Sequence, residues 1–323
     1  MAKFIGRVCL WGGSALVVVL LCGTLLQWSL SNGTARRLAA PGMKIDVGGH
    51  RLHLRCQGSG TPTVVFEAGL PGSSLAWASV SGEVASFTTT CSYDRAGYAW
   101  SEPSPAARSA GNIVRELHLL LRNSGIAAPF VLVGHSFGGL LMQLYASQYP
   151  DDVAGMVLVD SSHSGLAHQS IDLDRIATIG RTVGILAPTG IPRFLFPLPA
   201  GDPASREDSV RAAETALMKT TKSVRTAAAE MAALRTSLQE VAASPLSLGN
   251  KPLYVLSEGR RRAEFWLELQ EDLTGLSTAS EWRIAERSGH FIHHDQPELV
   301  IEAVRTVVRR SRSDETVVSG TIP

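Results

Sequence analysis

The chain has 323 residues, of which 45% are hydrophobic and 18% are charged, so it has enough apolar material for a sizeable folded core. Its 30 Lys and Arg residues nearly balance its 29 Asp and Glu residues and form no long basic run, which argues against binding to nucleic acid through the phosphates. Its four cysteines are too few for a disulfide scaffold and lack the C-x-x-C spacing of a zinc site.

The N-terminal segment contains an apolar run, from Val8 to Leu30, that has no charged residue. As a helix, this run would be about 35 Å long, and the hydrocarbon core of a bilayer is about 30 Å thick. A cleaved signal peptide usually has an apolar stretch of only about 7–15 residues, and no A-x-A cleavage site follows here. We therefore expect residues 1–42 to form an uncleaved transmembrane helix and a linker, with a cleaved signal peptide and secretion as the alternative.

The basic residues around this run do not decide its orientation. Lys3 and Arg7 precede the run, and Arg36, Arg37 and Lys44 follow it, so positive charge is similar on the two sides. A short N-terminal tail in front of a large domain is compatible with a cytoplasmic N-terminus. We therefore expect a single-pass membrane protein whose main domain lies outside the cytoplasm.

After residue 42, short apolar runs alternate with helical patterns. The segment His50–Cys56 alternates between apolar and polar residues, which is typical of a half-exposed strand. Continuous apolar runs, which suit strands buried on both faces of a parallel sheet, occur at Thr63–Phe66, Phe130–Val133, Met156–Val159 and Leu253–Leu256. Helical patterns at Asn112–Ser124 and Leu140–Gln148 lie between them. This alternation predicts an α/β fold, with a mostly parallel open sheet flanked by helices, over residues 43–160 and 251–311.

The strand pattern stops in the middle of the chain. For about 90 residues, from 161 to 250, no strong strand run occurs, and Ser209–Ala243 has the composition and spacing of helices. Because the strand pattern resumes at Leu253, we expect residues 161–250 to be a helical cap on the sheet; a separate helical domain is the alternative. A helix near Pro297–Arg310 follows, and we expect residues 312–323 to be a flexible tail.

The sharpest motif is the G-x-S-x-G sequence Gly134-His135-Ser136-Phe137-Gly138, which lies directly between a predicted strand and a predicted helix. In this strand–turn–helix setting the motif is typical of a nucleophile elbow, because a serine on a strained turn leaves no room for side chains on its flanks. The N-terminus of the following helix can also stabilise a developing oxyanion. The motif therefore predicts that Ser136 is a catalytic nucleophile, with a glycine-rich structural turn as the alternative.

A serine nucleophile needs a base, and His290 is the best candidate among the nine histidines. It follows a predicted strand over Glu281–Ala285 and precedes the last helix. In an open α/β sheet, ligands collect at the carboxyl ends of the strands, so this loop can reach Ser136. His293 and His294 are close enough in sequence to be confused with the base, but we expect them to cap or pack against the last helix.

Taken together, these motifs resemble those of the α/β-hydrolase superfamily, over roughly residues 44–310 apart from the cap. The resemblance implies an oxyanion hole formed by the backbone N–H groups of Leu70 and Phe137. Ala68 stands where a histidine is common in the family, which leaves this backbone role intact. Asp94 and Arg95 correspond to a loop that is structural in relatives. The supporting segments are Phe66–Gly72, Tyr93–Tyr98, Gly134–Gly138 and Ser288–His290.

The acid that would orient His290 is less clear from the sequence. In the superfamily the acid follows either the seventh or, less often, the sixth strand. The chain has no Asp directly after Leu253–Leu256, but Asp160 directly follows Met156–Val159. We therefore predict that Asp160 orients His290 and stabilises its imidazolium form. A purely capping role for Asp160 is the alternative, and Glu258 and then Asp272 are the rival acids.

The resemblance also places two cysteines on neighbouring antiparallel strands. Cys56 ends an early strand, and Cys91 lies in a predicted strand over Thr88–Tyr93. Directly opposed residues in such strands are within disulfide range, and a bridge would require an oxidising compartment. We predict a Cys56–Cys91 disulfide, with two buried thiols as the alternative. Cys9 and Cys22 lie in the apolar N-terminal run.

These features predict a membrane-anchored serine hydrolase that cleaves a small-molecule carboxylic ester through an acyl-enzyme and requires no cofactor or metal. Serine at the elbow argues against haloalkane dehalogenases and epoxide hydrolases, relatives that use an aspartate there. The apolar segment Ile191–Pro197 could line a lipophilic acyl pocket or form the core of the cap. Amide, lactone, thioester and C–C bond hydrolysis stay open, as does perhydrolysis. A ligand-binding or signalling protein on an inactive scaffold is the alternative from another class.

Overall fold

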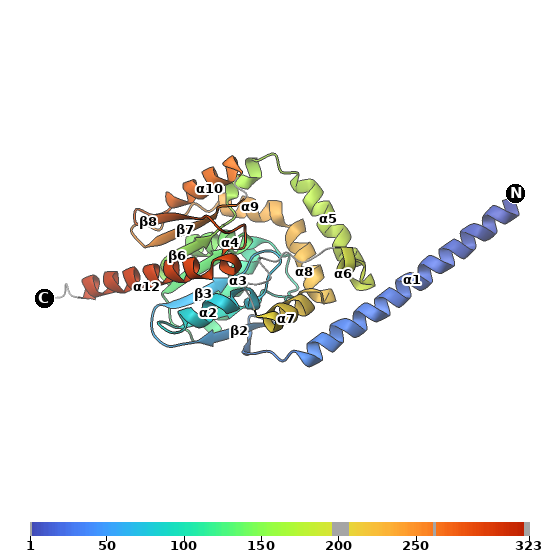
Figure 1. Ribbon diagram of the computed structural model, residues 1–323, viewed down its shortest axis with the longest axis horizontal. Coiled ribbons are helices and arrows are strands. Elements are labelled where there is room, and N and C mark those ends of the chain that lie inside the picture. Colours follow the sequence, from blue (N-terminus) through green and yellow to red (C-terminus); the bar gives the residue numbers. More distant parts are fainter. Residues whose placement is uncertain (1, 196–206, 261–262, 320–323) are drawn as a thin grey trace.

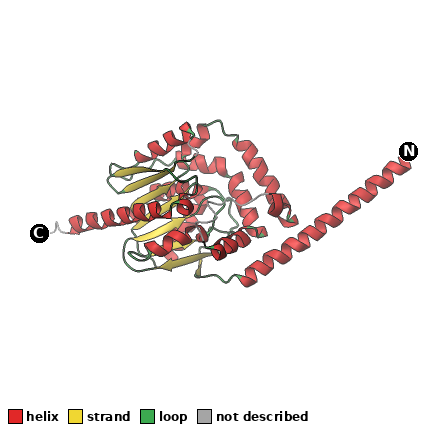
Figure 2. Cartoon of the chain, viewed as in Figure 1, coloured by secondary structure: helices red, strands yellow, loops and turns green. Residues whose placement is uncertain are grey.

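In the computed structural model, residues 2–195, 207–260 and 263–319 are described. They form a sheet with helices on both faces and further helices beside it, from which a long N-terminal helix, α1 (Ala2–Arg37), projects (Figures 1 and 2). Residues 196–206 of the predicted cap and 320–323 of the predicted tail lie outside the described residues.

The sheet has eight strands in the order β1-β2-β4-β3-β5-β6-β7-β8. β2 is antiparallel to both β1 and β4, and all other neighbours are parallel, so the mostly parallel sheet predicted from the sequence is confirmed. The strand β1 was not predicted, because its sequence MKID is too short to give a pattern. The strands are β1 (Met43–Asp46), β2 (Arg51–Gln57), β3 (Thr63–Glu67), β4 (Thr90–Tyr93), β5 (Phe130–His135), β6 (Val153–Val159), β7 (Leu253–Glu258) and β8 (Ser280–Ala285).

Alternate residues of the central strands enter two separate cores. In β3, Val64 and Phe66 pack on one face of the sheet, and Val65 packs on the other. One face is covered mainly by α2 and α12, and the other mainly by α3 and α4 (Figure 1). This double covering explains why the strands read as continuous apolar runs. The helices of this part are α2 (Ala78–Val84), α3 (Ala110–Asn123), α4 (Phe137–Gln148), α10 (Glu264–Thr274), α11 (Ile292–Asp295) and α12 (Pro297–Ser319), with short 3₁₀ helices η1 (Ser74–Trp77) and η2 (Pro150–Asp152).

Between β6 and β7, the described residues form helices and no strand. We use the name cap for residues 161–250, as in the sequence prediction. Its helices lie on one side of the sheet, between the sheet and the projecting part of α1 (Figure 1). They are η3 (Ser164–His168), α5 (Leu173–Leu186), η4 (Ala187–Thr189), α6 (Ile191–Leu195), α7 (Asp208–Met218), α8 (Thr221–Ala232) and α9 (Leu234–Ala242).

The C-terminal helix α12 is longer than expected. It continues to Ser319, so residues 312–319 are helical where the sequence analysis expected a flexible tail. No Gly or Pro interrupts the chain before Gly320, so nothing breaks the helix. Arg312 also fastens this end to the sheet layer, because its guanidinium donates hydrogen bonds to the carbonyls of Thr61 (2.7 Å) and Phe87 (3.0 Å).

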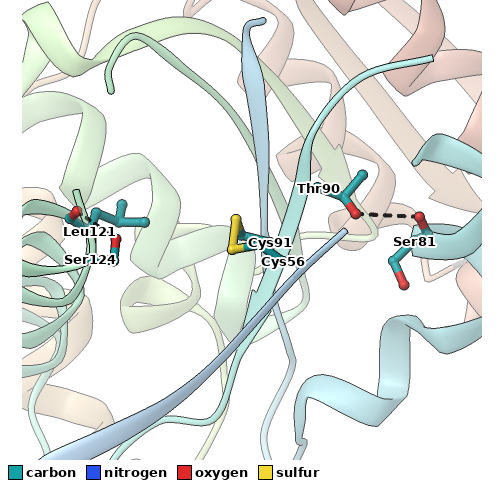
Figure 3. The surroundings of a disulfide bond; sticks show 6 residues. All are labelled: Cys56, Ser81, Thr90, Cys91, Leu121 and Ser124. Atoms are coloured by element: carbon teal, nitrogen blue, oxygen red, sulfur yellow. Dashed lines mark hydrogen bonds between the residues drawn. A yellow bond between two sulfur atoms is a disulfide. The ribbon is translucent and has the colours of Figure 1, made fainter. Parts of the chain in front are cut away.

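The predicted disulfide is present. Cys56 of β2 and Cys91 of β4 are directly opposed in the antiparallel register, with Cα atoms 4.1 Å apart, and their sulfur atoms are bonded (Figure 3). Cys91 is buried, whereas Cys56 is exposed at the surface. The bridge ties together two strands that are 35 residues apart in the sequence.

The helix α1 contains the candidate membrane span. Among the described residues, Trp11–Arg37 is the one helical stretch that is long and apolar enough to cross a bilayer; a window of 18 residues within it has a mean hydropathy of 1.8, and 6% of that window is buried. Length and composition would also suit a signal sequence near the N-terminus. The N-terminal half of α1 extends away from the rest of the chain, and its C-terminal half lies beside the cap (Figure 1).

Candidate active site

Ser136 stands on a strained turn between β5 and α4. Its backbone has φ 53° and ψ −123°, which places a non-glycine residue in a sparsely populated region. β5 ends at His135 and α4 begins at Phe137, so the turn has the strand–turn–helix form of a nucleophile elbow. Ser136 is partly exposed, whereas its neighbours His135 and Phe137 are buried.

The glycines around Ser136 stand where there is no room for a side chain. A Cβ atom at Gly138 would lie 2.5 Å from the carbonyl oxygen of Glu67, and one at Gly134 would lie 2.6 Å from the Cα of Gly139. A Cβ at Gly139 would lie 2.1 Å from the Oγ of Ser161. A side chain at any of these positions would therefore displace the end of β3, the other arm of the turn or Ser161.

His290 is held by Asp160. The Nδ1 atom of His290 lies 2.6 Å from Oδ2 of Asp160, and Asp160 is completely buried. The other carboxylate oxygen of Asp160 accepts hydrogen bonds from the backbone N–H of Glu258 and from Nε1 of Trp266, each at 2.9 Å. Both oxygens are therefore hydrogen-bonded, which offsets the cost of burying the charge. Like Ser136, Asp160 has a positive φ, 42°, at the carboxyl end of its strand.

Ser136 and His290 line the same cavity, which has a volume of about 290 Å³. The imidazole rings of His135 and His290 are 4.6 Å apart, and Nε2 of His135 lies 2.8 Å from the carbonyl oxygen of His290, so the His290 loop lies against the elbow. With Nδ1 engaged by Asp160, Nε2 of His290 is the nitrogen left for chemistry in the cavity. The structure thus brings together the three side chains that the sequence analysis selected as Ser136, His290 and Asp160.

The two predicted oxyanion-hole residues flank the same site. Leu70 lines the cavity beside Ser136. Phe137 is the first residue of α4, so its N–H has no acceptor within the helix and points out of the helix N-terminus. This arrangement suits stabilisation of negative charge near Ser136 Oγ.

The loop that carries Leu70 is fixed by a buried arginine. The guanidinium of Arg95 donates to the carbonyls of Ala68 (2.7 Å) and Gly69 (2.8 Å) and forms an ion pair with Glu67 (2.7 Å). Burial alone would lower the pKa of Arg95, but the carboxylates of Glu230 and Glu67 outweigh it, so the pKa stays well above its ordinary value. Arg95 is therefore a permanently charged support for this loop, consistent with the structural role expected from the sequence.

Two histidines near His290 pack as aromatic side chains. The ring of His293 contacts those of Trp77 (4.7 Å) and His135 (4.4 Å), and the ring of His294 stacks on Phe291. Both belong to the short helix α11, which directly precedes and contacts the last helix, α12. Burial lowers the pKa of His135 well below its ordinary value, and the neighbouring His290 lowers it further. His135 is therefore a neutral part of the cavity wall at pH 7.

The two rival acids make other contacts. Glu258 reaches Asp160 with its backbone N–H, whereas the exposed carboxylate of Asp272 pairs with Nε2 of His163 at 3.0 Å. The carboxylate that contacts His290 is that of Asp160.

Sequence reasoning missed several residues of the site. Trp266, which supports Asp160, lies on α10 about 100 residues from it in sequence, and no local pattern marks it. Arg211 and Glu214 of α7 line the cavity. Of the apolar segment Ile191–Pro197, offered as an acyl pocket or as the core of the cap, the described residues Ile191–Leu195 do not line it, and residues 196 and 197 lie outside the described residues. Phe194 is instead 75% exposed at the surface. Which cap helix covers the cavity is decided by tertiary packing, and composition alone does not contain that information.

A metal site does not emerge from the geometry. Within residues 2–195, 207–260 and 263–319, no group of three or more His, Cys, Asp or Glu side chains is arranged to hold a metal ion. The histidines of the cavity contact one another through their rings.

Fold, elbow and sequence together define the class of this protein. The alpha/beta hydrolase family matches residues 64–303. The uncharacterized protein YqjL of Bacillus subtilis (strain 168) is 30% identical over 263 residues, which are 80% of this chain and 87% of that protein. The chain belongs to the alpha/beta hydrolase family.

Solved structures with the same fold include several hydrolases. An esterase from Thermogutta terrifontis, with malate bound, aligns with a TM-score of 0.61 and 23% identity over 83% of this chain and 98% of its own. The epoxide hydrolase CorEH aligns with a TM-score of 0.63 and 20% identity over 82% of this chain and 97% of its own. At these identities the likeness extends to the fold alone.

Proposed function

We propose that this protein is a serine hydrolase that cleaves carboxylic esters, with Ser136 as nucleophile, His290 as base and Asp160 as the acid that orients it. The observation that carries the proposal is the contact of the buried Asp160 with His290 Nδ1 (2.6 Å) beside a cavity that His290 and Ser136 both line. This contact fixes the tautomer of His290 so that Nε2 can accept a proton. A serine that stands on a strained turn and lines the same cavity suits nucleophilic catalysis.

The proposed reaction has two halves. In the first, Nε2 of His290 accepts the proton of Ser136 Oγ while Oγ bonds to the acyl carbon, and the N–H groups of Leu70 and Phe137 stabilise the oxyanion. The ester C–O bond then breaks, and His290 gives its proton to the departing alcohol. In the second half, His290 deprotonates a water molecule that attacks the acyl-enzyme. The acid leaves as the proton returns to Ser136 Oγ.

The side chain at the elbow favours an ester over an epoxide. Epoxide hydrolases of this superfamily open the ring with an aspartate at the elbow, and this chain has Ser136 there. A serine hydroxyl attacking an acyl group produces an oxyanion, for which the helix N-terminus at Phe137 is suited.

The cavity favours a short substrate with a polar end. Its volume of about 290 Å³ lies at the small end of ligand sites. Arg211 and Glu214 lie in the cavity wall contributed by α7, where a long apolar acyl chain would desolvate their charges. We therefore infer short acyl chains and a polar or charged substituent, in place of the lipophilic substrate that the sequence suggested.

We also propose that α1 stays attached as a membrane anchor, with the hydrolase domain outside the cytoplasm. The Cys56–Cys91 disulfide supports an oxidising compartment. Gln27 of α1 is buried against the cap, which supports retention of this helix in the mature protein. Protease protection of the chain in sealed membrane vesicles, with an antibody tag at each end, tests this orientation.

The function is tested with a series of chromogenic esters of increasing acyl length, on the full chain in detergent. We expect turnover that is highest for acyl groups of two to four carbons. Asp160→Asn should lower kcat by about 10⁴-fold, as in the triad enzymes in which this substitution fixes the wrong tautomer. The matched variant Glu258→Gln should stay near wild type. A crippled Glu258→Gln with an unharmed Asp160→Asn would contradict the assignment of the acid, and no turnover of any ester by folded protein would favour a binding role.

A further inference from the structure

The C-terminal half of α1 is built into the cap. The side chain of Gln27 is 2% exposed, donates to the carbonyl of Lys219 (3.0 Å) and accepts from Nε of Arg193 (2.7 Å). One turn earlier, a Cβ atom at Gly23 would lie 2.5 Å from the carbonyl oxygen of Thr189. The helix therefore packs directly against the backbone of η4, and the cap is held at a fixed height along α1.

That height coincides with the expected bilayer surface. The uncharged run Val8–Leu30 of α1 would be about 35 Å long as a helix, slightly more than the hydrocarbon thickness of about 30 Å, so Gly23 and Gln27 lie within its last three turns, near one bilayer surface. Between Trp11 and Leu26, most of the large apolar side chains are exposed, as for Val17 (55%) and Leu21 (59%). Trp28, 65% exposed, follows at the level where aromatic residues gather at membrane interfaces.

The cap exposes large apolar side chains close to the part of α1 that it contacts. Ile185 at the end of α5 is 78% exposed, and Phe194 and Leu195 on α6 are 75% and 65% exposed. They flank η4, the segment that touches Gly23, and Figure 1 shows α6 beside the middle of α1. Exposure of three large apolar side chains to water is unfavourable in free energy. A membrane beside α1 would cover this corner of the cap and remove these side chains from water.

Two basic residues lie near Ile185. Arg181 lies one helical turn before Ile185 on α5, and Arg225 of α8 lines the same surface groove as Ile185. Both arginines are exposed. Basic groups next to apolar anchors are the pattern of interfacial segments, in which the cations meet anionic lipid headgroups.

We propose that the corner of the cap formed by Ile185, Phe194 and Leu195 inserts into the interfacial layer of the lipid bilayer beside α1. This inference rests on the membrane anchoring proposed above and is independent of the hydrolase chemistry. The occupant is the lipid surface itself, with anionic headgroups at Arg181 and Arg225. Attachment through both α1 and this corner would fix the orientation of the domain relative to the membrane, whereas attachment through α1 alone would let the domain rotate.

The test uses the full chain in nanodiscs that contain phosphatidylcholine and phosphatidylserine. Cys9 and Cys22 are replaced by Ser, the Cys56–Cys91 disulfide is kept, and one environment-sensitive fluorophore is attached to Phe194→Cys. Nitroxide-labelled lipids then report contact with the bilayer. Val17→Cys in the span serves as the positive control, and Arg309→Cys on α12, on the side of the molecule opposite α1 (Figure 1), serves as the negative control.

We expect quenching at position 194 that is several-fold stronger than at position 309 and comparable to that at position 17. Quenching at 17 with none at 194 would overturn the docking and leave the anchor intact. No quenching at either position would overturn the anchor and the docking together. Hydrolysis of a water-soluble ester by the same labelled proteins reports separately on the proposed function, because none of these positions lines the cavity.

Discussion

Arg95 and Glu230 join the loop that carries Leu70 to the cap through a buried two-pronged ion pair. The Nε and Nη2 atoms of Arg95 each donate to a carboxylate oxygen of Glu230 at 2.9 Å, and both side chains are at most 1% exposed. In the same guanidinium, Nη1 donates to the carbonyl of Ala68, and Nη2 also donates to the carbonyl of Gly69. The position of a cap helix is thus coupled to the loop that carries Leu70.

Glu230→Gln should therefore affect both stability and rate. It leaves a buried cation with one carboxylate fewer, so we expect the free energy of unfolding to fall by about 3 kcal/mol. We also expect kcat for a short ester to fall at least tenfold, because Leu70 loses its support. Denaturant titration and steady-state kinetics measure the two effects. The control is Glu302→Gln, which removes the exposed partner of Arg283 and should cost about 0–1 kcal/mol. Equal effects of the two variants would contradict the coupling.

Trp266 should affect the catalytic rate through its hydrogen bond to Asp160. Trp266→Phe removes an N–H donor from a carboxylate that is completely buried, and a hydrogen bond to a charged group contributes about 1.5–3 kcal/mol. We expect kcat to fall by roughly tenfold or more with little change in KM. Trp282→Phe is the matched control, because it loses a hydrogen bond to Ser257 away from the cavity. If the two variants have the same kcat, the proposed positioning role of Trp266 is wrong.

The elbow should not tolerate a methyl group. Gly138→Ala would place Cβ 2.5 Å from the carbonyl oxygen of Glu67, so β3 or α4 must shift. We expect a loss of stability of about 1–3 kcal/mol and a loss of most esterase activity. Gly82→Ala in α2 is the control, since a Cβ there has nothing within 4 Å and a helical Ala should stabilise by about 0.4–1 kcal/mol. A fully active Gly138→Ala would show that the close packing of the elbow is not required.

Stability should decrease at mildly acidic pH. His135 is buried and its pKa in the folded state is well below the ordinary value of 6.5, so below about pH 6.5 the unfolded chain binds more protons than the folded chain. The free energy of unfolding should therefore fall as the pH drops through 6.5 and below. Urea titrations between pH 5 and 7.5 should give a steeper decline for wild type than for His135→Gln, with the exposed His168→Gln as control. Parallel profiles for all three would contradict this origin of the decline.

Features formed by residues that are contiguous in the sequence could be predicted, whereas features formed by residues far apart in the sequence were harder to predict or were missed. Ser136 was found because its glycines and the flanking strand and helix are contiguous in the chain. Choosing between Asp160 and Glu258 was harder, because these residues end adjacent parallel strands, β6 and β7, and both occupy the edge of the sheet where His290 lies. Only the packing of the His290 loop distinguishes them. Arg211 and Trp266 were missed for the same reason, since each reaches the site through helix packing that no local pattern records.

Labelling of the intact full-length chain with a fluorophosphonate, followed by peptide mass spectrometry, tests most directly whether Ser136 is activated by His290 and Asp160. We expect a single adduct on Ser136, none on Ser136→Ala, and labelling slowed by several orders of magnitude in folded His290→Gln. Labelling of another residue, or of Ser136 at an unchanged rate without the imidazole, would contradict the account.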